Sequence, residues 1–172
     1  MKFFSGFGFK REQALFKEYL DDAPFVLSGF SYGAQLATQE ALNALNIGKR
    51  VEKLQLISPA YFNDLPRGVL MKELDNFVKN RDLYMNFFYK KAAYPYKGDI
   101  TPFKSDPDLG QLKSLLLYRW KEEDLERLKS AGVDIEVFLG GFDKIVDAKK
   151  AGEFFAPFAS VYTIKDAGHL LR

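Results

Sequence analysis

The chain has 172 residues, of which 47% are apolar and 28% are charged, with 25 basic against 23 acidic side chains. This length predicts one globular domain spanning residues 1–172, and the net charge of +2 argues against a nucleic-acid partner. No apolar run reaches the roughly 18 residues of a membrane helix, and the N-terminal residues do not resemble a signal peptide, so we expect a cytoplasmic protein without a membrane partner. Because the chain has no cysteine and a single histidine, thiol catalysis and Cys-ligated or multi-histidine metal sites are excluded.

Strand and helix patterns alternate along the chain, which predicts an α/β fold with a mainly parallel sheet of about five strands. We expect strands at 2–4, 25–30, 53–57, 133–139 and 161–164, and connecting helices at 11–20, 32–46, 121–131 and 147–155. Residues 59–120 show no strand pattern, and they contain helical patterns at 70–78 and 109–120 that Pro and Gly residues interrupt. This segment is expected to form a helical cap inserted in the domain.

One face of the expected sheet carries polar side chains. In the third and fourth strands, apolar residues alternate with Lys53, Gln55, Asp134 and Glu136. If right-handed crossovers join each strand to its neighbour in one direction, all connecting helices lie on the same side of the sheet. We therefore expect helices chiefly on one face and these four side chains on an uncovered face, which a homodimer contact could cover.

A G-x-S-x-G motif, Gly29-Phe30-Ser31-Tyr32-Gly33, stands between an expected strand and an expected helix. This context is typical of a nucleophile elbow, a turn that lifts the serine above the carboxyl end of the sheet. Glycines are required because side chains two residues before and two after the serine would collide in so tight a turn. Ser31 is therefore the candidate nucleophile.

A serine nucleophile needs a base within hydrogen-bond reach, and His169 is the single histidine. His169 follows the last expected strand, in a loop at the same end of the sheet as Ser31. The acid that orients the imidazole is Asp143, directly after a strand, or Asp147, which also suits a helix N-cap; we favour Asp143. The chain order Ser, Asp, His is that of α/β-hydrolases.

Acyl transfer also needs two hydrogen-bond donors for the oxyanion. The backbone N–H of Tyr32 follows the nucleophile, and that of Phe7 lies in a loop after the first strand. The Gly6-Phe7-Gly8 loop is not a phosphate-binding loop, because it lacks the third glycine of a dinucleotide fingerprint and the Lys-Ser/Thr of a P-loop.

Several segments resemble the short form of the pimeloyl-acyl-carrier-protein methyl ester esterases of biotin synthesis, in the α/β-hydrolase superfamily. These segments are FFSGFGF at 3–9, SGFS at 28–31, IEVF at 135–138, DKI at 143–145, KD at 165–166 and HLL at 169–171, with YM at 84–85 and FFY at 87–89 in the cap. The resemblance implies a minimal α/β-hydrolase fold, with Ser31 as nucleophile, His169 as base and Asp143 as acid. It also implies pimeloyl-carrier protein and methanol as products, with no metal and no organic cofactor. Ser5 departs from the histidine of larger α/β-hydrolases.

The cap carries an excess of positive charge, with eight basic and four acidic residues between 67 and 104. Such a patch could attract an acidic acyl carrier protein, although a solvated surface explains scattered lysines equally well. The candidate docking residues are Lys72, Lys79, Arg81, Lys90 and Lys91. The candidate acyl-channel residues are Tyr84, Met85, Phe87 and Phe88, whose spacing is also typical of ordinary core.

Two other functions fit the same residues. A small esterase or thioesterase could use this triad on another acyl substrate, since fold and triad do not define the substrate. A non-catalytic binding protein with a hydrolase fold is the alternative of another class. Occupation of all three triad positions favours an enzyme.

Overall fold

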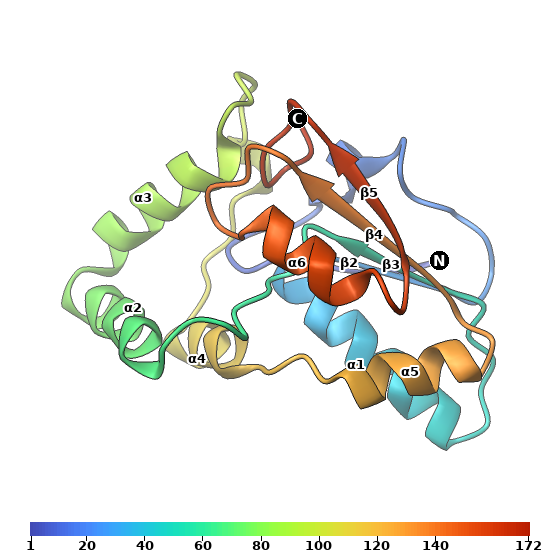
Figure 1. Cartoon of the computed structure of the whole chain (residues 1–172). Helices are drawn as coiled ribbons and strands as arrows, with labels where there is room; N and C mark the ends of the chain where they lie inside the picture. The colour runs from blue at the N-terminus through green and yellow to red at the C-terminus, as the bar shows by residue number, and fades with distance from the viewer.

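Five parallel strands form one sheet in the order β1-β2-β3-β4-β5 (Figure 1). The computed structural model describes residues 1–172. The strands are β1 Lys2–Phe4, β2 Val26–Phe30, β3 Lys53–Ile57, β4 Asp134–Gly140 and β5 Ser160–Ile164. All neighbours pair in parallel, so their carboxyl ends meet at one edge. The α/β class and the five-stranded parallel sheet expected from the sequence are confirmed.

Three α-helices cover one face of the sheet. They are α1 Tyr32–Asn46, α5 Glu122–Ser130 and α6 Ala148–Phe155. Helix α1 packs against β1, β2 and β3 through the fully buried Ala34, Ala37 and Ala41, whose small side chains allow a close approach. Helix α6 packs against β4 and β5, and α5 packs against α1 (Figure 1).

The segment between β1 and β2 lies on the opposite face, which corrects the expectation that every connection is on one side. Instead of the expected α-helix at 11–20, a short 3-10 helix, η1, spans Glu12–Phe16. The Phe16 ring lies 6.3 Å from that of Phe3 and 4.9 Å from that of Phe30. The register places Phe3 and Phe30 on the same face as Gln55. The handedness rule would place this connection on the helix-covered side as well, so the short segment that crosses the other face is an exception to it.

Gln55 is consequently buried, not exposed as expected. Its amide makes four hydrogen bonds, accepting from the Asp21 N–H and the Ser28 hydroxyl and donating to the Tyr19 carbonyl and the Glu136 carboxylate. Beside it, Lys53 lies 3.4–3.6 Å from the carboxylates of Asp21, Asp134 and Glu136. Asp134 remains exposed, as expected. The polar stripe of the sequence is therefore a hydrogen-bonded contact between the sheet and the segment after η1.

The segment between β3 and α5 forms a helical layer beside the carboxyl edge of the sheet (Figure 1). It contains α2 Arg67–Lys79, α3 Arg81–Ala93, the 3-10 turn η2 Thr101–Phe103 and α4 Leu109–Leu117. The helical patterns at 70–78 and 109–120 correspond to α2 and α4, although α4 ends before residue 120. Helix α3 was not predicted from the sequence.

Two side chains hold the base of this helical layer together. The Asn63 side chain donates to the Trp120 carbonyl at 2.8 Å and accepts from the Trp120 N–H at 2.9 Å. The Trp120 indole N–H donates to the Ala60 carbonyl, which also accepts from the Gln35 amide of α1. No helix in the structure is both long and apolar enough to span a bilayer.

The Gln55 network predicts the effect of removing its amide. Gln55→Leu leaves the Asp21 N–H and Tyr19 carbonyl without these partners, so we expect a loss of about 2–4 kcal/mol in the free energy of unfolding. Urea denaturation measures this loss. Asp134→Asn, on the exposed part of the same face, is the control and should change stability by less than about 0.5 kcal/mol. Equal stability of the Leu variant and the wild type would contradict the importance of this contact.

Candidate active site

Ser31 lies in a sharp turn between β2 and α1. Its φ is +54° and its ψ is −111°, a strained backbone conformation for a residue other than glycine. A Cβ added to Gly33 would come within 1.9 Å of the Phe4 carbonyl oxygen, so a glycine is needed where α1 passes β1. The turn has the conformation that its motif predicts for a nucleophile elbow.

Asp143, His169 and Ser31 form a continuous chain of contacts. His169 Nδ1 lies 2.6 Å from Asp143 Oδ2, and Nε2 lies 2.9 Å from Ser31 Oγ. Since a carboxylate only accepts hydrogen bonds, Nδ1 carries the hydrogen and Nε2 can accept the Ser31 proton. The side chains of His169 and Asp143 are 0% and 1% exposed, and this exclusion of water strengthens the electrostatic interaction between them.

The second oxygen of Asp143 fixes the carboxylate in place. Oδ1 accepts hydrogen bonds from the backbone N–H groups of Ile145 at 2.7 Å and Val146 at 3.0 Å. Asp147 instead caps α6, accepting from the Lys150 N–H at 3.1 Å. Of the two candidate acids, the structure therefore places Asp143 against His169 and gives Asp147 the role of a helix cap.

The loop after β5 brings His169 to the end of β2. Phe142 N–H donates to the Ala167 carbonyl at 2.8 Å, which joins this loop to the loop after β4. A Cβ on Gly140 would lie 2.0 Å from the Gly168 carbonyl oxygen, so the two backbones touch directly. The imidazole packs against the Phe30 ring, with centroids 5.0 Å apart.

The two predicted oxyanion donors lie at the ends of neighbouring strands. Phe7 is in the loop after β1, and its N–H donates to no acceptor within the protein. Tyr32 is the first residue of α1, where a backbone N–H has no intrahelical acceptor. Both N–H groups are thus available to a ligand, and their role as oxyanion donors stays a prediction.

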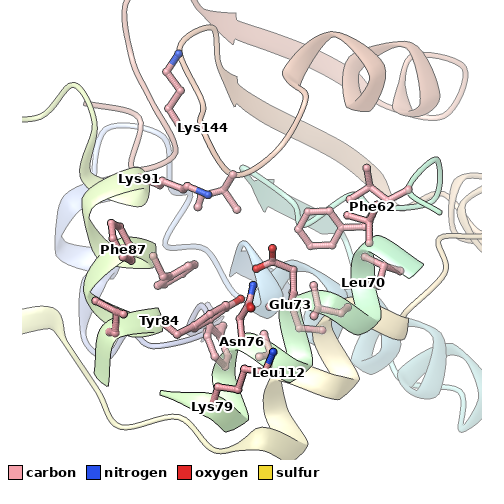
Figure 2. Close-up of a pocket in the computed structure, with 18 of the residues that line it drawn as sticks. Phe62, Leu70, Glu73, Asn76, Lys79, Tyr84, Phe87, Lys91, Leu112 and Lys144 are labelled. Carbon is pink, nitrogen blue, oxygen red and sulfur yellow. The ribbon is translucent and has the colours of Figure 1, made fainter. Parts of the chain in front are cut away.

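A cavity of about 610 Å³ lies between the cap helices and two loops of the sheet. Thirteen of its nineteen lining residues are hydrophobic. Phe7 and Ile145 line it on the side of the sheet, so it lies beside the triad, although Ser31 and His169 are not part of its lining. Figure 2 shows Glu73 pointing into the cavity and Lys91 approaching it from α3. The Lys144 side chain extends from the β4–α6 loop away from Glu73, and its ammonium lies 5.3 Å from the centre of the Tyr94 ring.

Three of the four expected channel residues, Tyr84, Phe87 and Phe88, line this cavity. Met85 does not. It is buried on the other side of α3, where its methyl group would lie 2.8 Å from a Cβ on Gly8. Burial and the neighbouring Glu73 carboxylate raise the pKa of the Tyr84 phenol.

The five expected docking residues have different surroundings. Lys79 and Lys91 line the cavity. Lys72 is exposed on α2, and the Lys90 ammonium lies 5.8 Å from the centre of the exposed Phe87 ring. Arg81 forms an ion pair with Asp106 and donates to the Pro107 carbonyl, so its charge is partly neutralised.

Several residues that line the cavity were not predicted from the sequence. Leu112, Leu115 and Leu116 of α4 line the cavity, and their spacing of three and four residues was a detectable signal of a buried helix face. Glu73 and Lys144 had no such signal, because single charged residues are common on solvated surfaces. Their position depends on the packing of the cap against the sheet.

A hydroxyl, a base that can accept its proton and a buried acid that orients the base are the groups required for acyl transfer through a serine. The structure holds no group of three or more His, Asp or Glu side chains that could bind a metal ion. The arrangement suits nucleophilic chemistry at a carbonyl.

No protein-family model and no curated protein sequence matches the chain. Solved structures do: the esterase EaEST from Exiguobacterium antarcticum is 18% identical, with a TM-score of 0.63 over 91% of this chain and 63% of its own. A lipase-esterase related protein from Clostridium acetobutylicum is 14% identical, with a TM-score of 0.65 over 98% and 86%. BioG from Haemophilus influenzae is 15% identical, with a TM-score of 0.60 over 98% and 87%.

These likenesses show that the chain has an α/β-hydrolase fold, as expected. The chain spans 53–63% of the length of EaEST and of several other esterases and hydrolases that it matches.

The different positions of the two acids predict different effects on serine reactivity. Asp143→Asn should slow labelling of Ser31 by a fluorophosphonate probe on the order of 10⁴-fold, because the amide can hold the imidazole in the wrong tautomer. Mass spectrometry of the labelled peptide measures the rate. Asp147→Asn is the matched control and should react like the wild type, since Asn also caps helices. A slow Asp147 variant beside a fast Asp143 variant would assign the acid to Asp147.

Proposed function

We propose that the protein is a serine ester hydrolase that removes the methyl group from pimeloyl-acyl-carrier-protein methyl ester. The contact of Ser31 with His169, and of His169 with Asp143, carries this proposal. The motifs shared with the short-form esterases support the substrate. The fold likeness to BioG and to the esterase EaEST agrees with an ester hydrolase.

In the first half of the proposed reaction, Ser31 Oγ attacks the ester carbonyl carbon while His169 Nε2 takes the hydroxyl proton. The electron pair of the carbonyl bond moves to oxygen, and the N–H groups of Phe7 and Tyr32 stabilise the resulting oxyanion. Asp143 stabilises the imidazolium. When the tetrahedral intermediate collapses, His169 returns the proton to the methoxy oxygen, methanol leaves and the acyl group stays on Ser31.

In the second half, water attacks the acyl-serine carbonyl and His169 takes a proton from that water. Collapse of the second intermediate breaks the bond between the acyl carbon and Ser31 Oγ, and His169 returns the proton to Ser31. The acid that forms loses its proton to solvent and leaves as pimeloyl-carrier protein.

The cavity supports an acyl substrate with a long attachment. Its mainly hydrophobic lining suits the methylene chain, since apolar walls bind apolar chains without desolvating polar groups. A methyl ester at Ser31 would leave the thioester end of the chain in the cavity under the cap. Lys79, Lys91 and Lys144 line this cavity and provide positive charge for an acidic carrier protein.

Incubation with methyl pimeloyl-carrier protein tests the proposal. We expect loss of the methyl group with the thioester intact, and no loss with Ser31→Ala. Mass spectrometry of the carrier protein measures this loss. Rapid release of the carrier thiol with the methyl ester intact would identify a thioesterase. No reaction with this substrate or with small esters, together with no fluorophosphonate labelling, would support a non-catalytic binding protein.

The lysines that line the cavity predict a salt-dependent effect on the carrier-bound substrate. Lys79→Glu combined with Lys91→Glu should lower kcat/KM for that substrate about 10-fold or more at low salt, because long-range attraction raises the encounter rate. The loss should shrink at high salt, where charges are screened.

Two controls separate docking from damage to the site. Lys17→Glu combined with Lys49→Glu makes the same change of charge on exposed residues outside the cap, and it should leave kcat/KM nearly unchanged. A small uncharged ester should be hydrolysed equally by all three proteins. Equal losses on both substrates would mean that the cavity variant is misfolded, and no loss would mean that the carrier docks elsewhere.

A further inference from the structure

Glu12 is a buried carboxylic acid that the proposed mechanism does not use. It is the first residue of η1 and is 0% exposed. Its Oε1 accepts a hydrogen bond from the Gly6 N–H at 2.8 Å, and its Oε2 has no partner. Burial raises the pKa of Glu12, and the interactions with the Gly6 N–H, its own N–H and the Ser5 side chain oppose this rise. A buried acid with one unpaired oxygen is costly for the fold, and its hydrogen bond holds the backbone at Gly6.

Gly6 is fixed by hydrogen bonds on both sides of its Cα atom. The peptide group before Gly6 is held through its N–H by Glu12. The peptide group after Gly6 is held through its carbonyl, which accepts from the Phe9 N–H at 3.0 Å. This second group also contains the Phe7 N–H, which points opposite to the carbonyl because the peptide bond is planar and trans. The two bonds together restrain the backbone angles of Gly6 and thereby the direction of the Phe7 N–H.

A stiffer residue cannot replace Gly6. A Cβ at this position would lie 2.6 Å from the Phe30 ring. Because glycine has the greatest backbone freedom of all residues, its conformation must be restricted by its surroundings.

The far end of the loop is anchored to the cap. The Lys10 N–H donates to the Phe103 carbonyl at 2.8 Å, and the Tyr89 hydroxyl donates to the Gly8 carbonyl at 2.7 Å. At the end of the loop next to β1, the Gly6 N–H donates its hydrogen bond to Glu12.

We propose that Glu12 is a positioning residue, which holds Gly6 so that the Phe7 N–H is directed at the oxyanion. This inference rests on the proposed function. Glu12 acts through the backbone of the loop and touches neither the substrate nor Ser31. It therefore affects the transition state, in which the oxyanion forms, more than the binding of the ester.

The kinetics of Glu12→Ala and Glu12→Gln on a small ester test this role. Loss of one oxyanion donor lowers kcat about 10²–10³-fold, so a donor that is misdirected by Glu12→Ala should lower kcat about 10- to 100-fold with little change in KM. Glu12→Gln should restore kcat to within about 5-fold of the wild type, because its carbonyl oxygen can accept the Gly6 hydrogen bond. The neutral amide also resembles the uncharged acid that burial favours.

Two further measurements separate positioning from a general loss of stability. Leu15→Ala, a core truncation in the same 3-10 helix, should lower Tm but retain kcat. Amide hydrogen exchange followed by NMR should show a slow Gly6 N–H in the wild type and Glu12→Gln, and a fast one in Glu12→Ala. If Glu12→Ala does not fold, Glu12→Asp, whose side chain is one methylene shorter, replaces it and should show the same losses.

Each outcome decides the proposal. It is overturned if Glu12→Ala keeps the wild-type kcat, if Leu15→Ala loses as much kcat as Glu12→Ala, or if exchange at Gly6 is unchanged. A wild type that hydrolyses no ester would refute the proposed function and with it the oxyanion role. The exchange data would then still show whether Glu12 fixes this loop.

Discussion

Backbone contacts that leave no room for a side chain determine the centre of this molecule. At Gly33, α1 packs directly against the Phe4 carbonyl. At Gly140, the end of β4 packs directly against the Gly168 carbonyl. A larger residue at either position would separate the segments that carry the reactive groups. The distances from His169 to Ser31 and Asp143 therefore depend on the close contacts at Gly33 and Gly140, which involve none of these three residues.

Buried polar groups connect this centre to the far face of the sheet. The segment from η1 onward contributes the Glu12 carboxylate to the loop that contains Phe7, and the Tyr19 carbonyl to the buried Gln55 amide. Because an unpaired polar group in a dry interior is costly, each of these bonds favours the same placement of the segment. One short connection thus covers the sheet and supports the active-site loop.

The strands were predictable because apolar runs of strand length mark them. Ser31, Asp143 and His169 were predictable as site residues because a Gly-Ser-Gly turn and loops at the carboxyl ends of parallel strands are also local patterns. Helix α3 was not, because its apolar residues occupy two faces, one packed on the core and one lining the cavity, and this removes the single stripe that marks a helix. The burial of Gln55 was also unpredictable. It depends on which face of the sheet the segment between β1 and β2 crosses, and the local hydrophobic pattern does not indicate this face.

The paired hydrogen bonds between Asn63 and Trp120 close the cap at its base, joining residues 57 positions apart. Loop-closure entropy grows only with the logarithm of length, so a change in the length of the chain between these residues adds little entropic cost to the fold. In such a fold the cap and the sheet can change independently during evolution. Substitutions in the cap that keep its contacts with Gly8 and Lys10 can therefore reshape the cavity while Ser31, Asp143 and His169 stay in place.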